Sequence, residues 1–280
     1  MPKPLLSVVV PTRNRADYLE VALRSLTAQR LDGALELLVV DDHSDDRTPT
    51  VIEQAGARAV PLGDARGLNA ARNAGLRAAS ADLVALVDDD ISAPAGYAAA
   101  LVEGAARHPG AEAFGGPIRA RFDGPAPRGC GREPAPITTL DLGGVDTEAD
   151  LVWGTNMALR RSAFERIGPF DEAIADGGDE EDWLRRLQAA GGTVMYIAEA
   201  ALEHRRAGDD ARLRSLARGA YGRGRAMRAY DRRRGTEPTL AHEARVLAGC
   251  GWHTLRRACP QGIVMGAHSA GRLVEAVRGG

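Results

Sequence analysis

Three consecutive aspartates, Asp88, Asp89 and Asp90, directly follow an apolar run. Carboxylates packed this closely repel one another, so bringing them together costs free energy unless a positive charge lies between them. Asp88 and Asp90 have the spacing D-x-D, which offers two hard oxygen ligands. Mg²⁺ or Mn²⁺ suits such a pair, because these ions take few protein ligands and keep phosphate oxygens and water. The sequence therefore predicts a divalent cation site shared with a phosphate-bearing substrate.

Two further apolar runs also end in polar residues. Residues 5–10 lead into Pro11-Thr12-Arg13-Asn14, and residues 35–40 lead into Asp41-Asp42-His43-Ser44. A single acidic residue at such a position is commonly a helix cap, but a triple aspartate exceeds what one cap needs. In an open α/β sheet, ligands bind at the carboxyl ends of the parallel strands. We therefore expect all three polar segments to line one rim of a sheet.

The elements that must position these residues alternate along the first half of the chain. Helical patterns separate apolar, β-rich runs at residues 5–10, 35–40, 57–62 and 82–87. Apolar runs that do not alternate with polar residues indicate strands buried on both faces, as in a parallel sheet covered by helices. The predicted fold class is therefore α/β, with a mostly parallel, Rossmann-like central sheet flanked by helices.

The second half of the chain is less regular and ends in a basic region. Residues 120–150 are rich in Gly, Pro and Asp and are expected to form a loop over the sheet. Residues 205–235 contain eleven arginines against three aspartates, a local net charge of +8. We place a domain boundary near residue 208. Residues 1–208 are expected to form the domain that carries the chemistry, and residues 209–280 an Arg-rich helical extension.

The bulk composition is that of a soluble globular protein, and a formal net charge of −2 gives no indication of nucleic-acid binding. The three cysteines are an odd number without CxxC spacing, so we expect neither a disulfide framework nor a zinc site, and a reducing compartment. The first apolar run is too short for a secretory leader, and no run approaches the roughly 18 residues of a membrane span. The chain is therefore predicted to be cytoplasmic.

Three other enzyme and signalling classes share parts of this pattern. A haloacid-dehalogenase-type phosphatase has a D-x-D-x-[TV] motif after an apolar strand, which "DDDIS" almost matches, and "LLVVDD" is typical of a phosphoacceptor receiver domain. Both need a lysine further along the chain, and Lys3 is the only lysine in the sequence. A dinucleotide-binding dehydrogenase needs G-x-G-x-x-G after its first strand, where this chain has "PTRNR". All three classes are excluded.

Five segments in order carry a more specific resemblance: "SVVVPTRNRADYLEVALRSLTAQ", "ELLVVDDHSDDRT", "RGLNAARNAGLRAASADLVALVDDD", "WGTNMALRRSAFERIGPFDE" and "GGDEEDWLRRL". Together they resemble the inverting family 2 glycosyltransferases of the GT-A fold. The resemblance covers about residues 5–204. The remaining residues match no motif that we can name.

The resemblance implies a nucleotide diphosphate sugar donor, bound along the ends of the first strands. One of Asp41 and Asp42 would accept a hydrogen bond from the base, which suits an N–H edge such as that of uracil or guanine. The implied donor-binding residues are Pro11, Thr12, Arg13, Asp41, Asp42, Asn69, Arg72, Asp88 and Asp89. The implied ligands of Mn²⁺ or Mg²⁺ are Asp88, Asp90 and His204.

The last two segments imply the sugar, the acceptor and the catalytic base. Trp153 would stack on a sugar, although a core tryptophan is an alternative, while Thr155, Asn156 and Asp182 would lie on the sugar and acceptor side. The family's E-D-x-D-L-x-x-R pattern occurs here with its first two acids exchanged in type. Glu180 is therefore our first choice for the base and Asp179 the second.

The implied reaction is transfer of the sugar to an acceptor hydroxyl with inversion, with one base and a metal-stabilised leaving group. The acceptor would be a carbohydrate or a lipid-linked molecule. With a lipid-linked acceptor, the Arg-rich region would make peripheral contact with the inner face of the membrane. An Arg-covered helix that packs on the catalytic domain is the alternative for this region. The alternative function is an inactive GT-A-like domain that binds a nucleotide sugar or an anionic surface.

Overall fold

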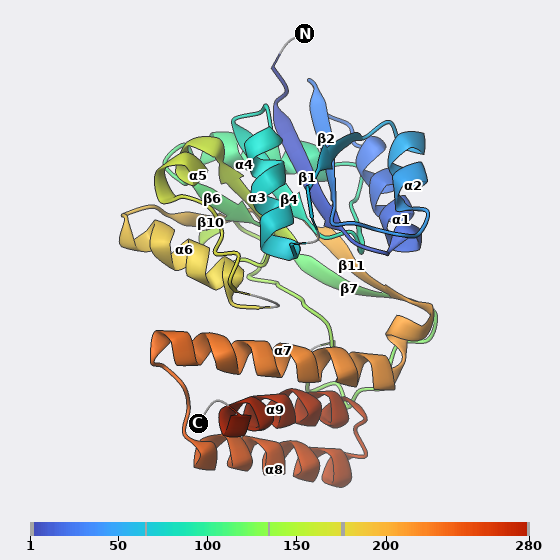
Figure 1. The fold of residues 1–280 in the computed structure, drawn as a ribbon, viewed down its shortest axis with the longest axis vertical. Helices are drawn as coiled ribbons and strands as arrows, with labels where there is room; N and C mark the ends of the chain where they lie inside the picture. Colours follow the sequence, from blue (N-terminus) through green and yellow to red (C-terminus); the bar gives the residue numbers. More distant parts are fainter. Residues whose placement is uncertain (1–2, 65, 134, 175–176, 279–280) are drawn as a thin grey trace. The chain divides into compact units, whose positions relative to one another are not determined.

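The computed structural model describes residues 3–64, 66–133, 135–174 and 177–278. By contacts it divides into two compact units (Figure 1). The first comprises residues 1–119, 138–173 and 179–204, and the second comprises residues 120–137, 174–178 and 205–280. The expected domain boundary near residue 208 stays a prediction.

The first unit is built around a mixed sheet with the strand order β3-β2-β1-β4-β9-β6-β10-β8. Its first four strands are parallel, as the continuous apolar runs predicted, and β9 then runs antiparallel to both β4 and β6. The strands are β1 (Leu6–Thr12), β2 (Leu35–Asp41), β3 (Arg58–Pro61), β4 (Leu83–Val87), β6 (Ala113–Gly115), β8 (Thr147–Glu148), β9 (Asn156–Arg160) and β10 (Val194–Tyr196).

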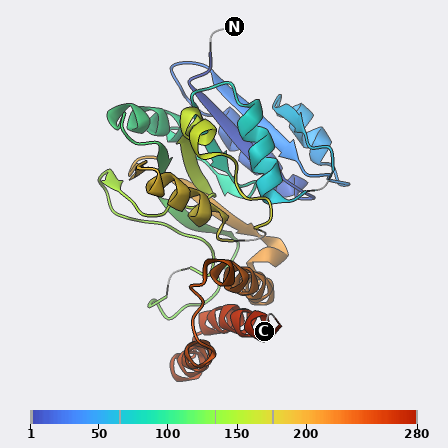
Figure 2. The ribbon, with the colours of Figure 1, turned by 60° about the vertical axis from the view of Figure 1, so that its left-hand side comes forward.

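Helices cover both faces of this sheet (Figures 1 and 2). Alternate residues of β1 separate the two cores: Val8 and Val10 pack in one apolar cluster with α1, α2 and α4, and Val9 packs in another with α3, α5 and α6. The helices are α1 (Ala16–Thr27), α2 (Thr48–Gln54), α3 (Leu68–Ala78), α4 (Tyr97–Arg107), α5 (Arg161–Ile167) and α6 (Asp179–Ala189). This double burial is why the strands contain few polar positions.

A second, small sheet has the strand order β5-β11-β7. Its strands are β5 (Ile91–Ser92), β7 (Ile118–Asp123) and β11 (Leu202–Ala207). The antiparallel register places His204 opposite Ile91, and therefore one residue from the last of the three aspartates. The region expected to be a loop, residues 120–150, is mostly irregular but contains the end of β7 and all of β8.

The second unit contains a short 3₁₀ helix, η1 (Gly208–Ala211), and three long helices, α7 (Leu213–Arg234), α8 (Leu240–Arg257) and α9 (Gln261–Arg278). The predicted helical extension is confirmed. The apolar side of α7 is buried within this unit, with Leu216 and Ala220 packed against Ile137 and Val264. Arg272 on α9 joins the helices by donating to Glu243 on α8 and to Asp231 on α7, both at 2.7 Å.

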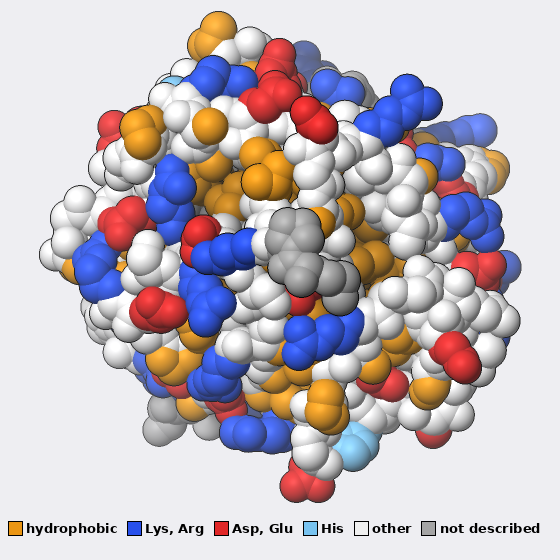
Figure 3. All heavy atoms as spheres, turned by 90° about the horizontal axis from the view of Figure 1, so that it is seen from above, with side chains coloured by type: hydrophobic (Ala, Val, Ile, Leu, Met, Phe, Trp, Pro, Cys, Tyr) orange, Lys and Arg blue, Asp and Glu red, His pale blue; other side chains and the backbone are white. Residues whose placement is uncertain are grey.

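Basic and acidic side chains are interspersed on the face seen in Figure 3, which fits a net charge near zero. Within the described residues, no helix is both long enough and apolar enough to span a membrane.

Candidate active site

The ends of β1, β2 and β4 form the rim on which the candidate site is built. The parallel register sets Thr12 beside Asp41, and β4 ends one residue before Asp88. Thr12 Oγ1 donates a hydrogen bond to Asp89 Oδ2 at 2.7 Å, which joins the ends of β1 and β4. The strand-end residues singled out in the sequence therefore meet at one edge of the sheet.

Asp89 and Asp90 share a partner, and Asp88 has a different one. Asp88 Oδ2 accepts a hydrogen bond from Thr155 Oγ1 at 2.6 Å. Arg15 forks between the other two, with Nη1 2.6 Å from Asp89 Oδ1 and Nη2 2.9 Å from Asp90 Oδ2. The sequence analysis missed Arg15, although it lies in the same polar segment as Arg13 and follows it by two residues.

Arg15 does not fully compensate the negative charge of this group. Burial raises the pKa of Asp89 to about 7 although the Arg15 guanidinium opposes the shift, and the neighbouring Asp90 raises it further. Burial is the main cause of this shift and the repulsion between neighbouring carboxylates adds to it, so ionising all three side chains costs free energy. Additional positive charge at this point would therefore be favourable.

Asp88, Asp90 and His204 together could supply such a cation with ligands. Their ligand atoms lie within 4.8 Å of one another, and His204 Nε2 is 3.3 Å from Asp90 Oδ1. The other ring nitrogen, Nδ1, is 3.0 Å from the carbonyl oxygen of Thr138, which can only accept, so Nδ1 carries a proton. In the neutral ring, the lone pair of Nε2 then faces the carboxylate oxygen of Asp90, and the two repel each other. A cation bound between them would remove this repulsion. Two carboxylates and an imidazole suit Mn²⁺ or Mg²⁺.

Arg72 connects the aspartates to the acids of α6. Its side chain is 2% exposed, and it forms ion pairs with Asp179 through Nη1 and with Glu180 Oε1 through Nη2, the latter at 3.0 Å. The same Nη2 lies 3.9 Å from Asp88 Oδ1. The carboxylates after β4 and those at the start of α6 therefore belong to one connected cluster.

Asp179 and Glu180 have different protonation preferences in this cluster. Burial raises the pKa of Asp179 to about 7 against the effect of Arg72, and the neighbouring Glu180 adds to the rise. For Glu180, burial acts in the same direction, but Arg72 and a hydrogen bond from Asp179 hold its pKa below the usual value. Glu180 Oε1 also accepts a hydrogen bond from the Gly154 amide at 3.0 Å. Within this pair, ionisation is therefore favoured at Glu180 over Asp179.

Residues 153–156 lie next to these acids but have different environments. Trp153 is 37% exposed, so the core alternative does not describe it, whereas Trp183 is completely buried. Thr155 is engaged with Asp88, as described above. Asn156 is buried, and its amide group is fully engaged: Oδ1 accepts from Tyr97, while Nδ2 donates to the carbonyls of Pro117 and Ala200. The Asn156 side chain therefore holds neighbouring backbone in place and is not available to bind a sugar.

The two aspartates at the end of β2 also differ. Asp42 is buried and accepts hydrogen bonds from the backbone amides of Arg66 and Gly67 at 2.7 and 3.1 Å, so both of its oxygens hold the loop before α3. Asp41 lines a cavity of about 580 Å³ between β2, β3 and α2. Its Oδ1 accepts hydrogen bonds from the amide and the hydroxyl of Ser44, at 3.0 and 2.5 Å, which leaves Oδ2 for a ligand. In Asp42, by contrast, both oxygens are committed to the loop.

The remaining predicted residues take mainly supporting positions. Pro11 is buried in β1, and the exposed side chain of Arg13 lies 3.5 Å from Asp42. Asn69 is buried on α3 and donates to the carbonyl of Asp171 at 3.1 Å. Asp182 pairs with Arg186, one turn further along α6, at 3.0 Å.

The comparison with known protein families decides the classification. The family model described as Glycosyl transferase family 2 matches residues 7–168, more than half of the chain. The chain belongs to glycosyltransferase family 2. This match contains the rim at β1, β2 and β4, Arg72, and the segment from Trp153 to Asn156.

Two of the curated relatives of this family member come from Haloferax volcanii. Over 202 residues it is 25% identical to Glycosyltransferase AglE of Haloferax volcanii, covering 69% of this chain and 64% of the relative. Over 216 residues it is 26% identical to Glucosyl-dolichyl phosphate glucuronosyltransferase of the same organism, covering 71% and 69%. The chain thus spans slightly less than two thirds of AglE.

A solved structure shows the same fold. Mannosyltransferase PcManGT from Pyrobaculum calidifontis, in complex with GDP-Man and Mn²⁺, superposes with a TM-score of 0.60 at 19% identity, covering 100% of this chain and 77% of that one. At this identity the likeness concerns the fold. The predicted GT-A architecture is confirmed.

Proposed function

We propose that this chain is an inverting glycosyltransferase, which moves a sugar from a nucleotide diphosphate sugar to an acceptor hydroxyl with the help of Mn²⁺ or Mg²⁺. The observation that carries the proposal is the connected cluster. Through Arg72, the Asp88 side of the Asp88–Asp90–His204 group is linked to Glu180, an ionised carboxylate. A leaving-group cation and a base within one cluster are what a direct displacement requires.

In this mechanism Glu180 removes the proton of the acceptor hydroxyl as its oxygen attacks the anomeric carbon. The carboxylate is suited to the role because Arg72 keeps its pKa low, so that it is ionised at neutral pH. Asp88, Asp90 and His204 would hold the cation, which offsets the charge that develops on the departing diphosphate. Asp179 keeps its proton and positions Glu180 from the adjacent residue.

The donor would lie along the strand ends. Asp41 is the better candidate for the base contact, since Asp42 is already engaged by the amides of Arg66 and Gly67. A carboxylate acceptor favours a base with an N–H edge, so UDP- or GDP-linked sugars are proposed. The PcManGT structure contains GDP-Man, which supports this donor class without specifying the sugar.

The acceptor side would include Trp153, whose exposed indole could stack on a sugar face. A lipid-linked acceptor is supported by the similarity to the glucosyl-dolichyl phosphate glucuronosyltransferase of Haloferax volcanii. It would place the enzyme at the inner face of a membrane. Because the apolar side of α7 is buried in its own unit, contact with lipid would involve exposed arginines such as Arg214 and Arg218. Loss of vesicle binding at high salt is the expected signature.

The test of the base uses Glu180→Gln, with Glu181→Gln as the matched control. Glu181 is the next residue on α6 and pairs with Arg185 at 2.8 Å. We expect the first variant to lower kcat by about 10²- to 10⁴-fold, as for loss of a general base, and the second to leave kcat unchanged. Donor binding, measured by thermal shift with UDP, GDP, TDP or CDP and Mn²⁺ or EDTA, should survive in both variants.

Two results would contradict the proposal. Transfer that persists in Glu180→Gln but is lost in Asp179→Asn would assign the base to Asp179. A folded protein whose melting temperature responds to none of the four nucleotides would favour the alternative of a non-catalytic GT-A-like domain.

A further inference from the structure

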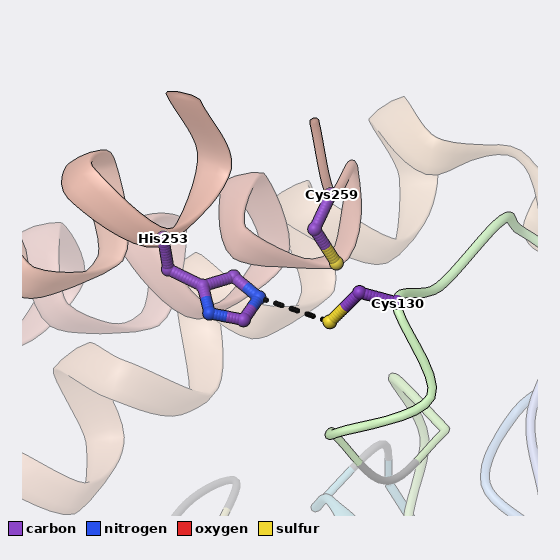
Figure 4. A group of neighbouring side chains, drawn as sticks. All are labelled: Cys130, His253 and Cys259. Carbon is purple, nitrogen blue, oxygen red and sulfur yellow. Dashed lines mark hydrogen bonds between the residues drawn. The ribbon is translucent and has the colours of Figure 1, made fainter. Parts of the chain in front are cut away.

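In the second unit, the side chain of Cys130 lies close to those of His253 and Cys259, which are more than a hundred residues away in the sequence. Cys130 lies in the segment after β7, His253 is on α8, and Cys259 lies just before α9 (Figure 4). Their ligand atoms all lie within 4.8 Å of one another, and Cys130 Sγ is 3.4 Å from His253 Nε2. The sequence analysis expected no zinc site because there is no CxxC motif, a criterion that detects only ligands close together in the chain.

The separation of Cys130 and His253 agrees with that expected in a tetrahedral metal site. With Zn–S near 2.3 Å and Zn–N near 2.05 Å, tetrahedral angles put a sulfur and a nitrogen about 3.6 Å apart and two sulfurs about 3.8 Å apart. The observed 3.4 Å between Cys130 Sγ and His253 Nε2 is close to the first value. Two sulfurs and one imidazole nitrogen form a soft ligand set, which selects zinc over magnesium or calcium.

A carboxylate beside the cluster orients one of the ligands for this role. Glu133 Oε1 lies 3.7 Å from His253 Nδ1, the nitrogen on the other side of the ring from Cys130. A carboxylate in that position is the usual outer partner of a metal-binding histidine, because it keeps the proton on Nδ1 and leaves Nε2 for the metal.

We propose that Cys130, His253 and Cys259 bind one Zn²⁺ ion, with water as the fourth ligand and Glu133 as the outer partner of His253. On binding, each thiol releases one proton to solvent, so two thiolates balance the charge of the ion. Partial exposure of Cys130 and His253 gives the ion access.

The ion would tie the segment around Cys130 to the connection between α8 and α9. Apolar packing contributes little to holding this unit together, because among the described residues its hydrophobic cluster contains four buried members, Ile137, Leu216, Ala220 and Val264. Small units with thin cores are commonly stabilised by a metal or a disulfide. The zinc site is therefore proposed as structural and independent of sugar transfer.

The first test is metal content of the full chain, purified without chelator and measured by elemental mass spectrometry. We expect about one zinc per chain. After removal of zinc, added Co²⁺ should produce thiolate-to-cobalt charge-transfer absorption. Cys130→Ser and Cys259→Ser should lose both signals. Cys250→Ser is the matched control, because Cys250 is a buried free cysteine outside the cluster, with Ser269 Oγ 4.0 Å away, and it should keep both.

Glu133→Gln tests the outer partner without removing a ligand. We expect zinc affinity, measured against a competing chelator, to fall by about 10- to 100-fold. The proposal is overturned if the wild-type chain binds neither Zn²⁺ nor Co²⁺, or if thiol titration shows a Cys130–Cys259 disulfide in protein purified under reducing conditions. Because these readouts are metal binding and absorbance, their failure would leave the transferase proposal unaffected, and loss of transfer in Glu180→Gln would leave this one unaffected.

Discussion

A methyl group at position 154 should displace both Arg72 and Glu180. A β-carbon built on Gly154 would overlap Arg72 Nη2 and Glu180 Oε1, the two atoms that form the ion pair next to the proposed base. The Gly154 amide also donates to that oxygen at 3.0 Å. Gly154 does not have a positive φ, so the backbone itself would accept alanine. The expected effect of Gly154→Ala is therefore steric and falls directly on the catalytic cluster.

The expected loss of stability in Gly154→Ala follows from the displacement of Arg72 and Glu180. Overpacking a buried site costs about 1–3 kcal/mol, and loss of a hydrogen bond to a charged group about 1.5–3 kcal/mol, so we expect roughly 3–6 kcal/mol of lost stability. For a unit of this size, each kcal/mol corresponds to roughly 2–4 °C in Tm, which gives a decrease of about 6–24 °C. The rate of sugar transfer should fall as well, because Glu180, the proposed base, would be displaced.

The assay compares Gly154→Ala with Gly110→Ala. A β-carbon at Gly110 would meet nothing within 4 Å, and this glycine does not have a positive φ either. We expect the control to remain within about 0.5 kcal/mol of the wild type in urea denaturation and to keep its activity. If Gly154→Ala were as stable and as active as the control, the position of Arg72 against Glu180 and the role assigned to the pair would both be refuted.

Three further predictions concern charge, aromatic packing and the proposed sugar site. The pKa of Asp89 is raised to about 7 in the folded protein, so between about pH 4 and pH 7 the folded state binds more protons than the unfolded state. The free energy of unfolding, measured in EDTA, should therefore fall as pH rises across that window, by at most roughly 4 kcal/mol. Urea denaturation at several pH values should show a shallower fall for Asp89→Asn; an unchanged slope would contradict the shift. Trp183→Ala should cost about 3–5 kcal/mol because Trp183 is fully buried against Phe170. Trp153→Ala should leave Tm nearly unchanged and lower transfer, and full activity in that variant would remove Trp153 from the sugar site.

Much of the fold could be predicted because its signals are local. The apolar run at residues 35–40 forms β2 (Leu35–Asp41), and a helix, α1 (Ala16–Thr27), separates it from β1 as predicted, since apolar spacing reports which faces an element buries. The antiparallel β9 between β4 and β6 was not predicted. Its order in the sheet depends on packing between segments distant in the chain, for which the sequence contains no local sign.

The candidate site shows the same division. Asp88 and Asp90 could be singled out from sequence because three adjacent carboxylates after a buried strand are unusual in themselves. The distinction between Asp41 and Asp42 could not, because it depends on the loop amides that Asp42 accepts from Arg66 and Gly67.

By itself, the sequence determined the α/β class, the strand ends that carry the acidic residues and the family to which they belong. These properties depend on residue types at short spacing along the chain, where periodicity and turn chemistry act. The tertiary structure alone decided that Arg72 pairs with Asp179 and Glu180, and that Cys130 meets His253 and Cys259. Such contacts join residues more than a hundred positions apart, and burial then sets their charge, so neither the pairing nor the protonation state follows from local pattern.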